Sequence, residues 1–363
     1  MNKDVSLFLD IGSSSVGATL VKTENKIPRI IFSIREPIKI FENPDMDILS
    51  GHTLKSLSIL LNKVRAKKME SPSKIQCILA SPWYISEFRK IIFKKNTPFI
   101  FSNKMASDIL KKEVEVFKKE KYELYGDLEN GEVLPIEMKT LKTTLNGYST
   151  DTPYNQKARE LKMEIFISLG SKMFIQKIKD TVEEQLPERE IKFSSFAFHS
   201  FTSARDMFPK ENFILLAVGG EISDILLVKN GSMNALSSFP VGSNHFIRQV
   251  SNTNNISFTE ATSLINRYNE GHASNNVIAN LVQDINIFEN SWLSSFEKNL
   301  YEHTEDIALP YIVFVSAESG LSNLFTNMVS NERVNQYAWT ENKFKVSHLP
   351  MEMLKNLSIN RFA

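Results

Sequence analysis

The stretch LDIGSSSVGATLVK, residues 9–22, decides how this sequence is interpreted, because LAVGGEISDILLVK, residues 216–229, repeats its layout. Each stretch is an apolar strand, a turn of glycine and small polar residues, and a second apolar strand, which is typical of a β-hairpin. Aligned without gaps, the stretches pair Asp10 with Ala217, Gly12 with Gly219, Ser13 with Gly220 and Gly17 with Asp224. Two matching hairpins so far apart in the chain predict two related lobes.

The turn residues of both hairpins indicate an anion site. Glycine lets the backbone approach a ligand closely, successive N–H groups in a turn form a concavity that suits phosphate oxygens, and serine adds hydroxyl donors. Two such turns facing each other across a cleft would hold the phosphates of a nucleotide from both sides. The candidate residues of the turns are Gly12, Ser13, Ser14, Ser15, Gly219, Gly220 and Glu221.

The composition is that of an ordinary globular protein. The chain has 363 residues, more than one compact core commonly holds, so two lobes or more are expected. Its 43 basic and 42 acidic side chains speak against a nucleic-acid partner, which requires a basic face. Short basic clusters at residues 65–68 and 94–95 are expected to be solvated surface.

The sequence predicts a cytoplasmic protein. Its single cysteine, Cys77, lies beside an apolar run and is expected to be a small buried hydrophobe in a reducing compartment. The N-terminal residues lack the pattern of a signal peptide. Uninterrupted apolar runs fall short of the roughly 18 residues of a transmembrane helix, so we expect none.

Four segments together resemble a known superfamily. The first hairpin is similar to the phosphate-1 loop, apolar–Asp–Ile–Gly–Ser/Thr, of the proteins that include actin, the heat-shock ATPase chaperones and the sugar kinases. The second hairpin resembles their phosphate-2 loop, and residues 312–324, IVFVSAESGLSNL, resemble their adenosine motif. Gly242 matches the glycine that follows phosphate-2. The resemblance implies an α/β fold of two actin-like lobes, built from duplicated RNase H-like domains.

The same resemblance exposes departures at the nucleotide site. Phosphate-2 loops of the superfamily begin with an aspartate that helps to hold Mg²⁺, where this chain has Ala217. The adenosine motif is glycine-rich in the superfamily but here includes Ser316, Ala317 and Glu318, whose side chains crowd the approach and add a negative charge. Asp10 remains as the candidate Mg²⁺ residue, because Mg²⁺ in proteins commonly uses only one or two carboxylates. Weak binding of ATP and Mg²⁺, with weak or absent hydrolysis, is therefore expected.

A segment between the hairpins narrows the resemblance. Asn103 is a candidate cap of a helix, strands are predicted at residues 133–138 and 161–168, and a second helix is predicted from Ser171. The arrangement resembles FtsA and PilM, which carry a small α+β domain inserted in the first lobe. We therefore expect a first lobe at 1–101, an inserted domain at 102–188, and the rest of both lobes at 189–363.

Arg267, near the end of a helix predicted over residues 258–271, is the candidate for a basic residue beside the adenine, by resemblance to FtsA. The pattern over residues 277–292 predicts a helix packed on the core. The six histidines lack metal-ligand spacing, so structural roles are expected. The chain ends in a segment, from Met351, that we expect to pack as a final helix rather than bind a membrane.

Three functions remain open on this sequence. The first is an FtsA-like scaffold of bacterial cell division with a degenerate ATP cleft, which binds partners or itself through the inserted domain. It would reach the inner face of the cell membrane through protein partners. The second is a PilM-like component of a type IV pilus assembly platform. The third is an active actin-fold ATPase or sugar-type kinase, against which Ala217 and the crowded adenosine motif speak.

Overall fold

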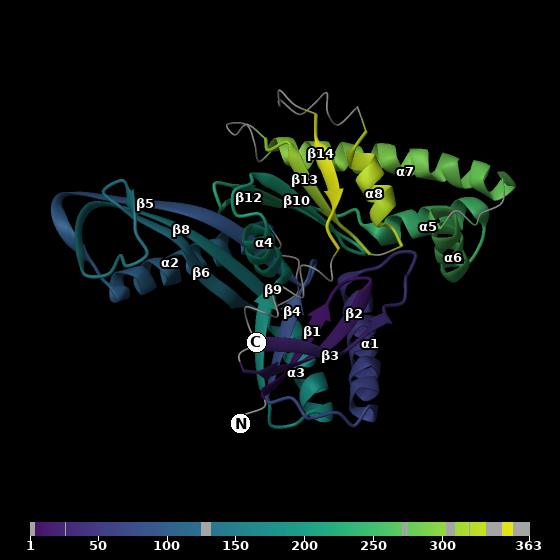
Figure 1. The fold of residues 1–363 in the computed structure, drawn as a ribbon, viewed down its shortest axis with the longest axis horizontal. Helices are drawn as coiled ribbons and strands as arrows, with labels where there is room; N and C mark the ends of the chain where they lie inside the picture. Colours follow the sequence, from purple (N-terminus) through teal and green to yellow (C-terminus); the bar gives the residue numbers. More distant parts are fainter. Residues whose placement is uncertain are drawn as a thin grey trace.

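A computed structural model gives the structure of the chain. It describes residues 4–25, 27–124, 132–270, 272, 275–302, 309–318, 320–331 and 343–350. These residues form two lobes and a protruding arm (Figure 1). Ser319 and the segment from Met351, for which a final helix was predicted, lie outside the described residues.

The first lobe is built on a five-stranded sheet. Its order is β3-β2-β1-β4-β9, and its strands are β1 (Asp4–Ile11), β2 (Ser15–Glu24), β3 (Ile27–Pro37), β4 (Lys74–Leu79) and β9 (Glu190–Ser195). Strands β3, β2 and β1 run antiparallel to one another, whereas β4 pairs in parallel with β1 and with β9. The first glycine turn is therefore the connection between β1 and β2, beside the carboxyl end of β4.

The second lobe repeats this topology. Its sheet has the order β12-β11-β10-β13-β14, with β10 (Phe213–Val218), β11 (Ser223–Lys229), β12 (Ser232–Phe239), β13 (Ile312–Ser316) and β14 (Lys345–His348). Again three strands are antiparallel, and β13 pairs in parallel with β10 and with β14. The two lobes thus share strand order and strand direction, and this confirms the predicted α/β fold of two related lobes.

Helices cover both sheets. The first lobe has α1 (Met46–Ala66), α3 (Lys172–Gln185) and α4 (Phe196–Met207), and the second has α5 (Ser243–Asn254), α6 (Phe258–Asn269), α7 (Asn275–Glu302) and α8 (Ser322–Val329). Asp45 caps α1, since its side chain accepts a hydrogen bond of 2.7 Å from the Ile48 N–H. A buried stripe that includes Leu57 and Leu61 then fixes α1 against the sheet. In the predicted core helix α7, Phe288 and Trp292 are buried.

Helix α4 joins the lobes. Every residue from Phe196 to Ala204 is buried, because the helix contacts both β9 and β11. Its apolar neighbours come from both sheets and include Phe213 and Phe314 of the second lobe. The buried part of this helix packs against strands of both sheets, so the two lobes share part of their core.

The inserted segment forms the arm. Its four-stranded sheet has the order β5-β8-β6-β7, with β5 (Tyr84–Phe101), β6 (Val133–Leu145), β7 (Tyr148–Ser149) and β8 (Gln156–Ser171), and α2 (Asn103–Leu124) covers one face (Figure 1). The strands predicted at 133–138 and 161–168 lie within β6 and β8. Asn103 lies in the first turn of α2, and the serine before it, Ser102, accepts the Met105 N–H at 3.2 Å.

The arm begins earlier in the chain than the predicted start at residue 102. Strand β5 already belongs to its sheet, and it pairs with β8 along most of its length. Helix α3, which the prediction included in the insertion, packs against α1 of the first lobe. Among the described residues, none of the helices is long and apolar enough to cross a membrane.

Candidate functional site

The first glycine turn is closed by its own backbone. The Gly12 N–H donates to the Ser15 carbonyl at 3.1 Å, and a side chain on Gly12 would lie 3.1 Å from that same oxygen. The turn is held from outside by the Trp83 indole, whose Nε1 donates to the Gly12 carbonyl at 2.8 Å. The Ser14 carbonyl accepts from the Ile38 N–H at 2.8 Å. The loop is therefore fixed on several sides before any ligand is considered.

The second glycine turn lies directly against the first. The Glu221 N–H donates to the Ser13 hydroxyl at 3.0 Å. A side chain on Gly220 would lie 2.8 Å from the backbone nitrogen of Ser14, a distance that real Cβ atoms essentially never show. The sequence predicts that the turns face each other, and the structure brings them into direct contact.

Gly242 packs closely against the second turn. A Cβ on Gly242 would lie 2.5 Å from the Gly220 carbonyl oxygen. The next two residues begin α5, and their N–H groups, of Ser243 and Asn244, donate to the Gly219 and Gly220 carbonyls at 2.9 and 2.8 Å. The first N–H groups of α5 thus bond to the turn itself.

The third predicted segment also reaches the first turn. Ser316, at the end of β13, pairs with Ala217 in the sheet, and both Ser316 and Ala317 are buried. Beyond them, the Glu318 carboxylate accepts hydrogen bonds from the hydroxyls of Ser14 and Ser15, the second at 3.1 Å. The hydroxyls proposed to contact phosphate are therefore bonded to a carboxylate of the chain itself.

Asp10 is engaged in a similar way. The Arg35 guanidinium forms an ion pair with its carboxylate and also donates to the Ser15 hydroxyl at 2.6 Å. Arg35 lies opposite Gly17 on neighbouring strands, where a Gly17 side chain would lie 3.0 Å from the guanidinium. Gly17 thus leaves room for the arginine to reach Asp10. The sequence reasoning missed Arg35, whose place opposite Gly17 is set by the β2–β3 register.

A second ion pair, which is buried, holds Glu221. The Arg248 guanidinium donates to both carboxylate oxygens of Glu221, at 2.5 and 2.9 Å, and the Asn244 amide adds a bond of 2.7 Å. Arg248 also donates to the Phe41 carbonyl of the first lobe at 2.5 Å. This network, which sequence reasoning did not find, ties α5 to the second turn and to the first lobe.

Asp224 occupies the junction between the lobes. Its carboxylate accepts hydrogen bonds from Ser81 of the first lobe, at 2.9 Å, and from Ser238 of β12, at 2.7 Å. Burial raises the pKa of Asp224 to about 6, while the two hydroxyls act in the opposite direction. The residue therefore joins the lobes as a carboxylate with neutral hydrogen-bond partners.

Arg267, the candidate for a basic residue beside the adenine, lies apart from these contacts. Arg267 is exposed on the last turn of α6, and α6 meets the β13–α8 turn through other residues, such as Asn269, whose amide donates to the Gly320 carbonyl. Burial lowers the pKa of His199 to about 4, and its ring bonds to the Ser194 hydroxyl at 2.6 Å, a structural role. No cluster of three acidic, histidine or cysteine side chains suited to a metal occurs in the part of the chain that the structure describes.

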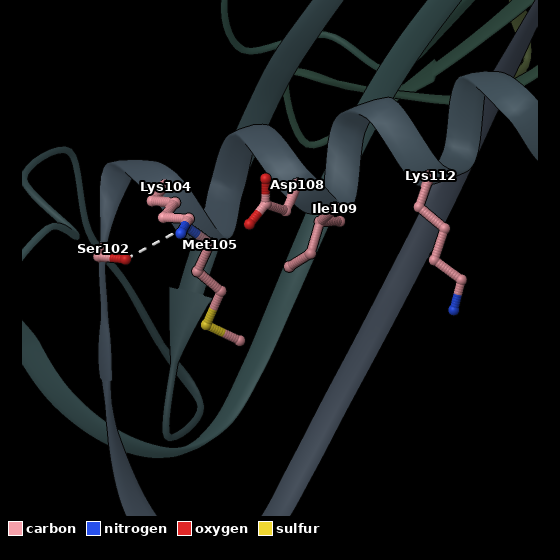
Figure 2. Close-up of a pocket in the computed structure, with 6 residues that line it drawn as sticks. All are labelled: Ser102, Lys104, Met105, Asp108, Ile109 and Lys112. Atoms are coloured by element: carbon pink, nitrogen blue, oxygen red, sulfur yellow. Dashed lines mark hydrogen bonds between the residues drawn. The ribbon is translucent and has the colours of Figure 1, made fainter.

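A pocket lies on the arm, far from the glycine turns in the chain. Its volume is about 360 Å³, and it is lined by Ser102, Lys104, Met105, Asp108, Ile109 and Lys112 (Figure 2). These residues all belong to the first turns of α2 and the residue before it. The pocket therefore belongs to the inserted unit and not to the predicted nucleotide cleft.

Comparisons with known proteins identify the fold of the chain. No family model and no curated protein matches the sequence. Among solved structures, a chain of the PilM–PilN type IV pilus biogenesis complex has a TM-score of 0.62 and 12% identity, over 99% of this chain and 95% of that one. The ethanolamine utilization protein EutJ from Carboxydothermus hydrogenoformans has a TM-score of 0.50 and 11% identity, over 100% and 91%. At such identities, the likeness shows a shared fold.

Proposed function

We propose that this chain, which has the actin-like ATPase fold, is a scaffold protein that holds protein partners and does not turn over ATP. One observation carries the proposal. The carboxylate of Glu318 is bonded to the hydroxyls of Ser14 and Ser15 in the turn that would otherwise hold phosphate.

Electrostatics explains why this contact opposes a nucleotide. A carboxylate and a phosphate about 4 Å apart repel by about 4 kcal/mol at an effective dielectric constant near 20. Glu318 would have to leave before a triphosphate could use these hydroxyls. The residues as they lie therefore do not fit a bound Mg²⁺-nucleotide.

The metal side of the site is altered as well. Mg²⁺ binds through carboxylate oxygens, but the Asp10 carboxylate is paired with the Arg35 guanidinium. Ala217, the residue that matches Asp10 in the second hairpin, offers no oxygen in its side chain. Weak or absent binding of ATP and Mg²⁺ is therefore part of the proposal, and phosphoryl transfer, which depends on such charge stabilisation, is not expected.

The idea of a protein partner comes from the comparison of folds. The PilM chain was solved in a complex with PilN, and we carry over the idea that this fold can hold a protein partner. Of the two scaffold roles weighed from the sequence, this favours a PilM-like platform component over an FtsA-like division scaffold. In either role, we propose a place at the inner face of the cell membrane, reached through protein partners.

The proposal is tested by removing the internal carboxylate. We expect the melting temperature of the wild-type protein to be unchanged by millimolar Mg²⁺-ATP, and phosphate release to stay at background. Glu318→Ala leaves the turn hydroxyls available and should gain a melting shift with Mg²⁺-ATP, because binding to the folded state alone stabilises it.

The matched control is Glu211→Ala, which removes an exposed glutamate from the turn after α4. This variant should respond to ATP as the wild type does. Steady ATP hydrolysis by the wild type, abolished in Asp10→Ala, would overturn the proposal and restore the active ATPase. Strong ATP binding by the wild type, unchanged in Glu318→Ala, would show that Glu318 does not block the turn.

A further inference from the structure

The outer face of the arm sheet carries an unusual set of side chains. Helix α2 covers one face, where Ile91, Phe93 and Leu161 lie in a buried cluster. The strands alternate, so their other residues point to the opposite face. The cross-strand pairs of that face are Lys90 with Glu164, Ile92 with Lys162, Lys94 with Glu160, and Ile100 with Lys157, and Glu164 also pairs with Lys142 of β6.

This face is basic. It presents five lysines against two glutamates, and Glu160 is shared, lying 3.2 Å from Lys94 and 3.2 Å from Lys162. The two lysines lower the pKa of Glu160, which indicates that this acid is already compensated. The whole chain has a formal net charge of only +1, so this face of the arm sheet is more positive than the chain as a whole.

Strand β5 is also the outermost strand of its sheet. The order β5-β8-β6-β7 places β8 on one side of it and leaves its other edge at the border of the sheet. On this strand, the Lys94 side chain is 66% exposed, and Ile92 is 60% exposed. Outer strands offer unpaired backbone groups to an added strand. The arm therefore combines a strand edge with a row of lysines and an exposed apolar side chain.

We propose that residues 90–94 of β5 dock an acidic, extended segment of a partner protein, which adds to the arm sheet as a further strand. In such a strand, alternate side chains would lie beside Lys90, Ile92 and Lys94 on the outer face, where carboxylates are favoured. The intervening side chains would lie beside Ile91 and Phe93, where apolar residues are favoured. The inference rests on the proposed scaffold role and names the chemistry of the partner.

Charge selects this occupant over a second copy of the chain. Two β5 strands placed edge to edge would bring the same lysines together, and like charges directly opposite destabilise a strand pair. Edge lysines of this kind deter pairing between copies, but they attract an acidic strand. The acid nearest to these lysines on β5, Glu87, lies on the other face, where it pairs with Arg89 at 2.9 Å.

The experiment uses the full chain and a labelled peptide that alternates glutamate and valine over seven residues. We expect the wild type to bind it, and Lys90→Glu/Lys94→Glu to weaken binding at least about tenfold. Lys90→Gln/Lys94→Gln adds no repulsion and should weaken binding less. This variant replaces the first one if the glutamate substitutions lower the melting temperature of the protein. The matched control, Lys111→Glu/Lys119→Glu, reverses two exposed lysines of α2 and should bind as the wild type does.

A second peptide, with its central valine replaced by proline, separates strand pairing from charge alone, because proline cannot donate to the ladder. Equal binding of this peptide, or an equal loss in the α2 control, would overturn the proposal. The proposal would also be overturned if the wild-type protein did not bind the peptide but bound phosphatidylglycerol vesicles through the same lysines. These results leave the ATP measurements untouched, so failure of the docking site and failure of the scaffold proposal are distinguishable.

Discussion

The two hairpins share a backbone plan but place their carboxylates differently. In the first lobe, one row across three strands reads Asp10, Gly17 and Arg35, and the matching row of the second lobe reads Ala217, Asp224 and Ser238. The carboxylate thus moves from the first strand of the hairpin to the second. In the first row its neighbour is a guanidinium, and in the second its neighbours are hydroxyls.

This difference shows what the glycine pattern controls. The pattern fixes a tight turn and the close approach of the two loops, which both hairpins share. The glycine pattern does not determine which side chains bond to the charged and polar groups of the turns. Those side chains come from other elements, namely β3, α5 and the β13–α8 turn. The following variants test the contrast between the two hairpins, beginning with the largest expected effect.

The largest loss of stability is expected when the Glu221–Arg248 ion pair at the second turn is broken. Arg248→Met leaves a buried carboxylate without its cation, and such losses cost about 4 kcal/mol of the free energy of unfolding. Urea unfolding followed by tryptophan fluorescence measures this, since Trp83 and Trp292 report on the first and second lobe. The double variant Arg248→Met/Glu221→Leu should recover most of the loss. A double variant no more stable than Arg248→Met would contradict this explanation.

The glycines of the two turns should respond unequally to alanine. At Gly220 the new methyl group meets backbone atoms of Ser13 and Ser14 at 2.9 and 2.8 Å, which cannot yield without separating the turns. We expect Gly220→Ala to lose about 3 kcal/mol. At Gly12 the nearest atom, the Ser15 carbonyl oxygen, lies 3.1 Å away. Gly12→Ala should stay within about 1 kcal/mol of the wild type, and equal losses in both variants would count against the direct contact.

These comparisons also show how far the sequence could lead. The hairpins follow from local signals, namely apolar runs and glycine turns. The two-lobe fold follows from the repetition of that hairpin and from the family resemblance, whereas the direct contact between the turns needed the structure. Arg35 could not be placed in the same way, because the β2–β3 register shifts at Leu20/Val21, and one residue of shift turns a side chain to the other face. Glu318 was foreseen as a negative charge near the ligand, but its bonds to the serines needed the structure.

The arm was harder to predict than the lobes. Strand β5 mixes charged and apolar residues and contains Asn96 and Pro98 near an irregularity of its pairing. The sequence prediction placed these residues at the end of the first lobe. The predicted helix from Ser171 exists as α3, with Ser171 as its cap. Its apolar face, however, packs in the first lobe. Sequence periodicity reveals an apolar face but not the element that covers it.

The two carboxylate rows should differ in their dependence on pH. Burial raises the pKa of Asp224 to about 6, whereas an unfolded chain titrates aspartate near about 3.9. The folded protein therefore binds this proton more tightly than the unfolded chain does. The contribution of Asp224 to the free energy of unfolding falls as the pH rises from about 4 to above 6. The free energy of unfolding of Asp224→Asn should exceed that of the wild type by about 3 kcal/mol at pH 7 and differ little from it at pH 4.

The same exchange in the first row should have the opposite sign at pH 7. Asp10→Asn loses the ion pair with Arg35, so this variant should be less stable than the wild type. Urea unfolding at several pH values measures both variants. If the wild type instead became more stable relative to Asp224→Asn as the pH rises, Asp224 would be stabilised as a charged group, and the prediction would be wrong.

The smallest effect is expected at the Asp10–Arg35 pair itself. The Arg35 side chain is 40% exposed, and ion pairs at such positions contribute about 0.2–1 kcal/mol. Arg35→Met should therefore lose less than about 1 kcal/mol, far less than Arg248→Met. Salt adds a second criterion, since ions screen exposed pairs more than buried ones. About 1 M NaCl should remove most of the Arg35→Met difference while leaving that of Arg248→Met. A salt-independent loss in Arg35→Met would show that the first turn depends on its guanidinium as strongly as the second, which would erase the contrast between the two hairpins.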